Sequence, residues 1–347
     1  MGHIEQDIER FLRTGEGPFD SLVLELFRYQ YERNKPYQSY CRSLNLGAAD
    51  VRRWQDIPAV PVGAFKSAEL ATFPVGQAAA VFESSGTTVR TPSRHYLKTL
   101  AYYETSLKTS FEKWMLQNSM SKMPFLILTP SPAEAPRSSL SWMMDVVKRT
   151  WGAPGSQYFV RHGRLDELWL STLLTKAQVT GSPALLLGTT IAYLALFDYC
   201  VRSGKRFHLP AGSRLMDTGG MKTEKREITR PEFVQRAEEF LGIPEDDCVN
   251  EYGMCEMSSQ FYGRGPSTLL EGPPWVRTLV FDPATGQEVP DGQPGLLRHI
   301  DLANVDSVLA IQTEDLGYRV TNGFVLLGRA PQADLKGCSV SAEAFLR

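Results

Sequence analysis

The sequence has few of the residues that mark metal-binding and disulfide-linked proteins. It contains five cysteines and five histidines in 347 residues. The cysteines are scattered without a C-x-x-C pair, and the histidines include no H-E-x-x-H or other close pair. This argues against structural zinc, a disulfide framework and a transition-metal site. Free thiols are therefore expected at Cys41, Cys200, Cys248, Cys255 and Cys338.

The chain also lacks an excess of charge and a long uninterrupted apolar run. Its 37 basic and 39 acidic residues give a net charge of −2, which argues against nucleic acid or an anionic membrane as a partner. The first ten residues are polar and acidic, unlike a secretory signal. The longest apolar stretch, residues 184–201, is interrupted by Gly188-Thr189-Thr190 and by Asp198, which favours buried core over a bilayer span. We expect a cytoplasmic protein with no transmembrane segment.

Helical periodicity and an alternation of strands, turns and helices run through most of the chain. Apolar residues at helical spacing predict two amphipathic helices in the first 35 residues. Short apolar strands are then followed by turns of Gly, Ser, Thr or Pro and by helical segments, beginning near residues 78, 125, 184 and 215. This pattern predicts an α/β fold, in which ligands gather where strands open into loops.

The pattern changes near Gly272, where helical spacing nearly disappears. Turn signals at residues 282–286, 291–292 and 321–323 predict β-hairpins. We therefore predict three parts: an α/β core with N-terminal helices over residues 1–271, a small β subdomain over 272–330, and a residual C-terminal tail over 331–347.

A cluster of hydroxyl residues around one glycine is the strongest local signal. Ser84-Ser85-Gly86-Thr87-Thr88 follows an apolar strand, and backbone N–H groups in such a loop can bind phosphate oxygens. The cluster taken alone favours an ordinary Ser/Thr turn, because neither a Walker A lysine nor a G-x-G-x-x-G pattern accompanies it.

Three further segments, read in order, favour a nucleotide site. Paired glycines follow a strand in Asp217-Thr218-Gly219-Gly220, where the backbone can approach a flat ligand. Residues 250–256 offer an aromatic face and a carboxylate a few positions apart. Late β segments end in Thr313-Glu314-Asp315 and in Gly328-Arg329.

The S-S-G-T-T, T-G-G, Y-G-x-x-E, T-x-D and G-R elements occur in this order and resemble the core motifs of adenylate-forming enzymes. The segment N-E-Y-G-M-C-E-M-S-S-Q-F-Y, residues 250–262, resembles the acyl-protein synthetase branch of the LuxE type. The resemblance extends from about Asp56 to Cys338. It implies an adenylate-forming large domain of helix-flanked β-sheets with a small β subdomain, and a usual mobile C-terminal domain that is absent or vestigial.

The resemblance also implies roles for single residues with ATP and Mg²⁺. Glu256 would help to bind Mg²⁺, Asp315 would accept hydrogen bonds from the ribose hydroxyls, and Arg329 would lie near the ribose. Gly219, Gly220, Tyr252 and Gly253 would form the adenine pocket, and the β- and γ-phosphates would be held by Ser84, Ser85, Gly86, Thr87 and Thr88. Each residue also has an ordinary structural alternative: a turn acid for Asp315, a helix N-terminal charge for Glu256, a core aromatic for Tyr252 and a surface ion pair for Arg329.

The implied reaction joins a carboxylic acid, most simply a fatty acid, to the α-phosphate of ATP. The acyl-adenylate is then attacked by a thiol, and in acyl-protein synthetases this thiol is a cysteine near the C-terminus that passes the acyl group to a partner reductase. Cys338, two residues after Lys336, stands at the matching place. Cys255 is the rival thiol, although ATP would crowd it.

The sequence departs from the usual pattern at two points. We expect the usual C-terminal domain with its catalytic lysine to be missing, and the phosphate loop lacks the Gly and Lys that commonly follow its threonines. The charge of the α-phosphate must then be met by other residues, for which Arg90, Arg94, Lys222 and Lys336 are candidates. Two alternative functions stay open: a ligase that uses coenzyme A or a carrier protein, and a non-catalytic nucleotide-binding scaffold for a reductase.

Overall fold

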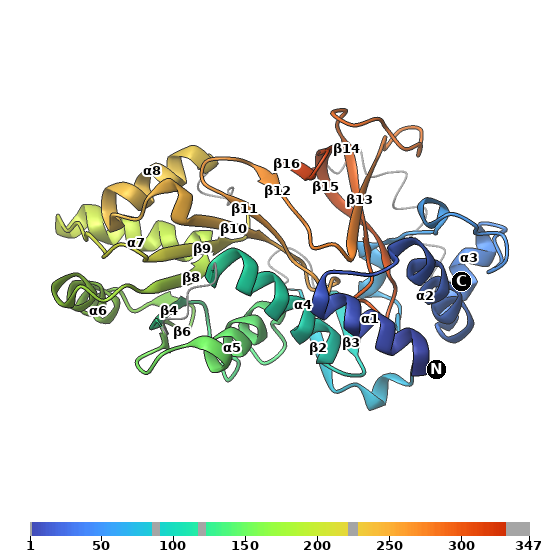
Figure 1. Cartoon of the computed structure of the whole chain (residues 1–347), viewed down its shortest axis with the longest axis horizontal. Helices are drawn as coiled ribbons and strands as arrows, with labels where there is room; N and C mark the ends of the chain where they lie inside the picture. Colours follow the sequence, from blue (N-terminus) through green and yellow to red (C-terminus); the bar gives the residue numbers. More distant parts are fainter. Residues whose placement is uncertain (1, 85–90, 117–122, 221–227, 331–347) are drawn as a thin grey trace. The chain divides into compact units, whose positions relative to one another are not determined.

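The protein is described by a computed structural model for residues 2–84, 91–116, 123–220 and 228–330. It divides into two compact units (Figure 1). Unit 1 contains residues 1–109, 254–260 and 271–347, and unit 2 contains residues 110–253 and 261–270. None of the helices in the described ranges is long and apolar enough to cross a membrane.

Unit 1 begins with the two predicted amphipathic helices, which are confirmed as α1 (Gly2–Thr14) and α2 (Phe19–Arg33). A third helix, α3 (Lys35–Ser43), follows at once, because the Asn34 side chain accepts a hydrogen bond from the N–H of Tyr37 and caps its start. Short 3-10 turns and small strands then lead to α4 (Ala101–Phe111), namely η1 (Trp54–Asp56), β1 (Val60–Pro61), η2 (Val62–Lys66), η3 (Val75–Gln77), β2 (Ala80–Glu83) and β3 (Arg94–Leu97).

The late strands of unit 1 form an antiparallel sheet in the order β16-β15-β14-β13. The hairpin predicted around residues 321–323 is confirmed, since it joins β15 to β16. β1 pairs in parallel with β15 on a separate branch of the sheet. The bounds are β13 (Val276–Phe281), β14 (Gly295–Asp301), β15 (Ala310–Val320) and β16 (Gly323–Arg329).

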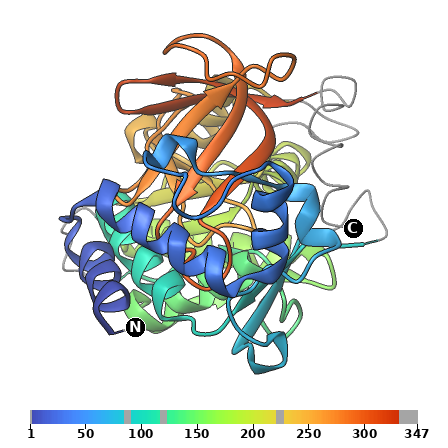
Figure 2. The same cartoon turned by 90° about the vertical axis from the view of Figure 1, so that its right-hand side faces the viewer.

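The N-terminal helices and the late strands belong to the same unit, whereas the sequence pattern had assigned residues 1–271 and 272–330 to separate parts. The Gln30 side chain of α2 donates to the carbonyls of Asn304 and Val305 and accepts from the N–H of Leu309. Figure 2 shows these helices, in blue, close to the orange and red strands. Local periodicity does not report such contacts, because the partners lie more than 270 residues apart in the chain.

Unit 2 is a sheet of mixed direction in the order β11-β10-β9-β8-β4-β5. The neighbours β5, β4, β8, β9 and β10 run parallel, and β11 is antiparallel to β10. Strand β4 is apolar and buried along its whole length, and β8 begins with three buried leucines, as expected when both faces are covered. The bounds are β4 (Phe125–Leu128), β5 (Gln157–Tyr158), β8 (Leu185–Thr189), β9 (Arg214–Thr218), β10 (Cys248–Tyr252), β11 (Phe261–Arg264) and β12 (Leu269–Leu270).

Helices α6, α7 and α8 pack through one hydrophobic core on the sheet of unit 2. Each begins at a side-chain cap and ends at a left-handed glycine: Asp166 and Gly181 for α6, Thr189 and Gly204 for α7, Thr229 and Gly242 for α8. In Figure 1, α7 and α8 lie on one side of β8–β10 and α5 on the other. The bounds are α5 (Ser139–Trp151), α6 (Glu167–Thr180), α7 (Thr190–Ser203) and α8 (Arg230–Leu241), with the hairpin β6 (Val160–Arg161) and β7 (Arg164–Leu165), a π-turn η4 (Glu112–Leu116) and a 3-10 turn η5 (Glu245–Asp247).

Candidate functional site

The predicted phosphate loop lies at the end of an antiparallel hairpin in unit 1. Strands β2 and β3 pair Glu83 with Arg94, and the loop between them is closed where Ser84 and Ser93 exchange two hydrogen bonds of 3.2 and 3.0 Å. The prediction of a helix after this strand was wrong. Pro92 disfavours helical backbone at the residue before it, so the chain returns as β3. Ser85, Gly86, Thr87 and Thr88 lie outside the described residues.

Arg94 is half-exposed at the base of this hairpin. Its guanidinium lies 3.4 Å from the carboxylate of Glu83, the residue opposite it on β2. The side chain is therefore held beside the loop by an ion pair with 49% of its surface still accessible. The other proposed sources of positive charge, Arg90, Lys222 and Lys336, lie outside the described residues.

Glu256 is nearly buried in a turn, not at a helix N-terminus. The two carbonyls that flank its Cα are both hydrogen-bonded within unit 1. The carbonyl of Cys255 lies 2.8 Å from Nδ1 of His95, and the carbonyl of Glu256 accepts a 2.9 Å hydrogen bond from Nδ2 of Asn304. The backbone on both sides of the predicted Mg²⁺ ligand is thus held in place.

The residues that follow Glu256 are held by a buried carboxylate. Asp301, at the end of β14, accepts hydrogen bonds from the N–H groups of Ser258 and Ser259 at 3.1 and 2.9 Å and from the Ser259 hydroxyl at 2.7 Å. Burial raises the pKa of Asp301, and these donors offset part of the increase. Asp301 therefore fixes the segment that carries the predicted metal ligand.

Asp315 and Arg329 are brought together as neighbours on adjacent strands. They are paired in the register of β15 and β16, with Nε of Arg329 3.8 Å from Oδ1 of Asp315. Asp315 is 16% exposed and Arg329 80% exposed. The N–H of Asp315 donates to the Thr313 hydroxyl at 3.1 Å, so the two ends of the T-x-D motif are connected by a side-chain hydrogen bond within β15.

The T-G-G motif and the Y-G-x-x-E motif of unit 2 lie at the ends of two neighbouring parallel strands, β9 and β10, at the same edge of the sheet. Thr218 on β9 is in register with Glu251 on β10, so Gly219 and Tyr252 follow as the next residues of adjacent strands. Gly219 has φ +98°, a conformation that other residues rarely adopt. The Tyr252 ring is half-buried and meets Phe261 edge-on at 5.9 Å. Ligands of open α/β sheets bind at such a carboxyl edge.

Two buried carboxylates lie beneath this edge. Asp217 forms an ion pair with Arg230, and both side chains are at most 3% exposed. Glu251 accepts a hydrogen bond from the Thr218 hydroxyl. Burial raises the pKa of Glu251 from 4.5 to about 7, with a further increase from the charge of Asp217, while the Thr218 hydrogen bond lowers it.

The rival thiol, Cys255, is a poor nucleophile in this structure. It is 7% exposed. Burial, followed by the neighbouring Glu256 carboxylate, raises the pKa of its thiol well above the ordinary value, which keeps it protonated at neutral pH. Cys338 and Lys336 lie outside the described residues.

The described residues contain no cluster of three or more His, Cys, Asp or Glu that could hold a metal ion. Mg²⁺ does not require one, because it is commonly bound through one or two carboxylates together with substrate phosphates and water. The carboxylate of Glu256 is a hard oxygen donor and fits this mode of binding.

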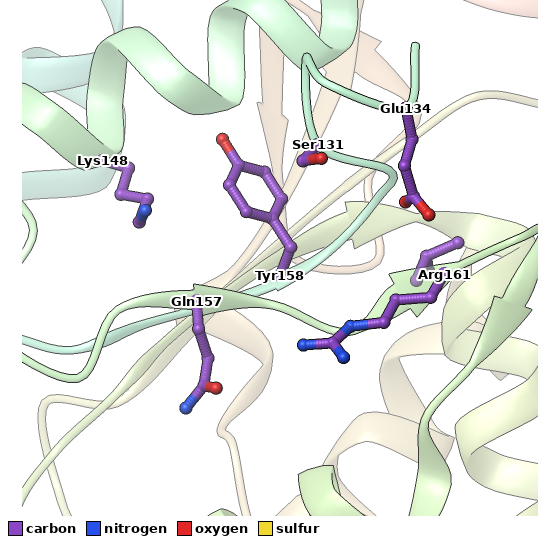
Figure 3. A pocket seen from close by; sticks show the side chains of 7 residues that line it. Ser131, Glu134, Lys148, Gln157, Tyr158 and Arg161 are labelled. Carbon is purple, nitrogen blue, oxygen red and sulfur yellow. The ribbon is translucent and has the colours of Figure 1, made fainter.

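A pocket of about 290 Å³ opens in unit 2 between the end of β4 and the β5–β6 segment. Figure 3 shows Lys148, Tyr158 and Arg161 around it. The motif residues of this unit do not line it. The Tyr193 and Leu194 side chains of α7 are buried in the core of unit 2.

The sequence analysis missed His95, Asp301 and Asn304. The signal available was polar residues inside otherwise apolar β segments, as in His299-Ile300-Asp301, and it is weak because such residues are common at strand ends. The predicted residues Ser84, Arg94, Glu256, Asp315 and Arg329 lie in unit 1, and Gly219, Gly220, Tyr252 and Gly253 lie in unit 2.

Comparison with known proteins extends the resemblance to nearly the whole chain. The long-chain-fatty-acid–luciferin-component ligase of Vibrio harveyi is 22% identical over 338 residues, which cover 93% of this chain and 87% of that protein. The ligase of the same name from Aliivibrio fischeri is 23% identical over 309 residues, covering 86% and 78%.

Among solved structures, an open conformation of 2-hydroxyisobutyryl-CoA ligase in complex with 2-HIB-AMP and CoA has a similar fold. The TM-score is 0.64 at 16% identity, and the match covers 89% of this chain and 69% of that chain. The predicted α/β fold of adenylate-forming enzymes is confirmed at this level. The family described as acyl-protein synthetase, LuxE, matches residues 14–346, and this chain belongs to that family.

Proposed function

We propose that this protein activates a fatty acid with ATP and transfers the acyl group to a thiol as a thioester. The observation that carries the proposal is the LuxE family match over residues 14–346, which contains all five nucleotide motifs in order. The curated relatives are long-chain-fatty-acid ligases, and this supports a fatty acid as the substrate.

In the first step, a carboxylate oxygen of the acid attacks the α-phosphorus of ATP. The bond from this phosphorus to the bridging oxygen breaks, and pyrophosphate leaves with the electron pair. The residues of the chain would act mainly by positioning the two anions and by neutralising charge. Arg94 and Lys336 are our candidates for the charge of the α-phosphate.

The nucleotide would be held by the predicted motifs. Ser84 and the following residues through Thr88 would bind the phosphates, and Gly219, Gly220, Tyr252 and Gly253 would form the adenine pocket. Asp315 and Arg329 would contact the ribose. Glu256 would hold Mg²⁺, which when bound supplies positive charge to the phosphate oxygens.

In the second step, the thiolate of Cys338 attacks the acyl carbon of the adenylate. The bond from the acyl carbon to the phosphate oxygen breaks, and AMP leaves. The thioester would then pass to a partner reductase, as the name luciferin-component ligase of the relatives suggests. The four described cysteines are all buried, which disfavours them as acyl carriers and supports Cys338.

Acid-dependent exchange of labelled pyrophosphate into ATP tests the first step, because it needs neither acceptor nor partner. We expect exchange with a long-chain acid, little with short or aromatic acids, and a large loss in Glu256→Gln. Glu239→Gln, which changes an exposed carboxylate paired with Arg206, is the matched control and should exchange normally. Absence of exchange with every acid, in a folded protein that binds ATP, would favour the scaffold function.

Intact mass tests the second step. After incubation with ATP and the acid, the wild type should carry one hydroxylamine-sensitive acyl group that Cys338→Ala lacks and Cys200→Ala retains. An unchanged adduct in Cys338→Ala would exclude this acceptor. Full thioester formation by Cys338→Ala with coenzyme A would instead identify a coenzyme A ligase.

A further inference from the structure

His95 contacts two segments of unit 1 that lie far from it in the sequence. It stands on β3, two residues after Ser93, which closes the phosphate-loop hairpin. Its Nδ1 lies 2.8 Å from the carbonyl of Cys255, and its Nε2 lies 2.9 Å from the hydroxyl of Ser307. The side chain is 1% exposed, so both contacts are shielded from water.

The protonation of the ring follows from its partners. A carbonyl accepts and cannot donate, so Nδ1 must carry a hydrogen. Burial lowers the pKa of His95 from 6.5 to about 4, so the ring is neutral near pH 7 and Nε2 is an acceptor. The Ser307 hydroxyl therefore donates to Nε2. One tautomer satisfies both ring nitrogens.

The partners of His95 are themselves fixed. Asn34 donates to the carbonyl of Ser307 at 3.1 Å, and Gln30 donates to the carbonyl of Asn304 at 2.6 Å. Asn304 in turn donates to the carbonyl of Glu256. The loop from Asp301 to Leu309 is thus a buried frame, and His95 connects the phosphate-loop hairpin to that frame and to the peptide that precedes Glu256.

We propose that His95 is a positioning residue that sets the Glu256 carboxylate relative to the base of the phosphate loop, through its hydrogen bond to the Cys255 carbonyl. The inference rests on the proposed function, in which Glu256 holds Mg²⁺ and the loop binds phosphates. Without this hydrogen bond the protein should require more Mg²⁺, because the backbone conformation that orients the Glu256 side chain is no longer fixed.

Two substitutions of His95 distinguish the roles of its two ring nitrogens. An asparagine amide N–H can occupy the place of Nδ1 and still donate to Cys255, whereas a glutamine amide reaches the place of Nε2 and Ser307. We expect His95→Gln to raise the Mg²⁺ concentration for half-maximal pyrophosphate exchange by about 10- to 100-fold. His95→Asn should stay within about threefold of the wild type, since it restores the donor that positions Glu256.

His299 provides the matched control. It is a second fully buried histidine of unit 1, its burial lowers its pKa to about 3, and its Nδ1 lies 3.0 Å from the hydroxyl of Thr278. His299→Gln should lower thermal stability as much as His95→Gln while leaving the Mg²⁺ dependence unchanged. Ser307→Ala removes the donor to Nε2 with little change of volume but keeps the hydrogen bond to Cys255, so it should stay within about threefold of the wild type, like His95→Asn.

Mg²⁺-dependent binding of ATP, measured by titration calorimetry on each variant, makes the test independent of turnover. A folded His95→Gln protein with wild-type Mg²⁺ dependence would overturn the inference, as would an equal shift in His299→Gln. If His95→Gln does not fold, His95→Ala, which also lacks the donor to the Cys255 carbonyl, decides by the same criterion. Failure of the wild type to exchange pyrophosphate with any acid would reject the proposed function, while the calorimetric comparison would still decide the role of His95.

Discussion

Glu251 on β10 accepts a hydrogen bond from the hydroxyl of Thr218 on β9, and the two residues stand directly opposite each other in the parallel register. Thr218 begins the T-G-G motif and Glu251 precedes Tyr252 in the Y-G-x-x-E motif. A side-chain hydrogen bond therefore connects the two motifs of unit 2 at the edge of the sheet. The carboxyl group that connects them has its pKa raised to about 7 by burial.

Glu251→Gln should make unit 2 more stable at alkaline pH. The pKa of Glu251 in the folded protein, about 7, exceeds its ordinary value of 4.5. The wild-type protein therefore has its full stability below pH 4.5, where Glu251 is protonated in both states, and loses stability as the pH rises through 7. The isosteric amide carries no charge and should gain up to about 3 kcal/mol at pH 8, shrinking to about 1 kcal/mol or less near pH 5. Urea unfolding at several pH values measures this difference.

Glu232→Gln is the control of opposite sign for this experiment. Glu232 accepts hydrogen bonds from the backbone N–H and the hydroxyl of Thr229 in the capping box of α8, and these lower its pKa. The ionised Glu232 therefore stabilises the folded protein above its ordinary pKa, and this stabilisation is lost at acid pH. Equal pH profiles for Glu251→Gln and the wild type would contradict the assignment of a buried titrating carboxyl.

Arg230→Met should strongly destabilise unit 2. The change leaves the carboxylate of Asp217 fully buried without its cation, which typically costs about 3–5 kcal/mol. Adding Asp217→Asn should recover part of the loss, since an amide carries no charge to desolvate. Arg206→Met, at an exposed pair with Glu239, should cost at most about 1 kcal/mol. Similar midpoints of urea unfolding for the two single variants would refute the prediction.

Gly219→Ala should cost about 1–2 kcal/mol, although among the described residues no atom beyond the two chain neighbours lies within 4 Å of the added Cβ. The strain comes from φ +98°, which must change and move the backbone after β9. Because this backbone belongs to the proposed adenine pocket, the KM for ATP should rise as well. Gly76→Ala also adds a Cβ in open space, but at an ordinary φ, and should leave both stability and KM unchanged.

The buried cysteines should resist alkylation in the native protein. Burial raises the pKa of Cys41 and Cys248 to about 12 and that of Cys200 to about 11, and it raises that of Cys255 as well. Iodoacetamide at pH 8 followed by peptide mapping should label Cys338 first and the other four only after unfolding. Rapid native labelling of Cys255 would show that its thiol is accessible and would reopen it as an acyl carrier.

The order of motifs and the local elements could be predicted from the sequence. Residues 125–128 form a strand because a short, wholly apolar run is buried on both faces, and α7 begins after Thr189 because its hydroxyl caps the first turn. Family membership followed from the five motifs. These signals are local, since each depends on residues within one element or one turn.

Tertiary structure alone decided which polar residues support the site. Ser84-Ser85-Gly86-Thr87-Thr88 predicted a loop, but the return of the chain as β3 depends on pairing with β2. The roles of His95, Asp301 and Asn304 depend on partners brought together from distant parts of the chain. A hydrogen bond between such residues leaves no periodic pattern in the sequence, because its partner is chosen by the packing of the whole unit and not by neighbouring residues.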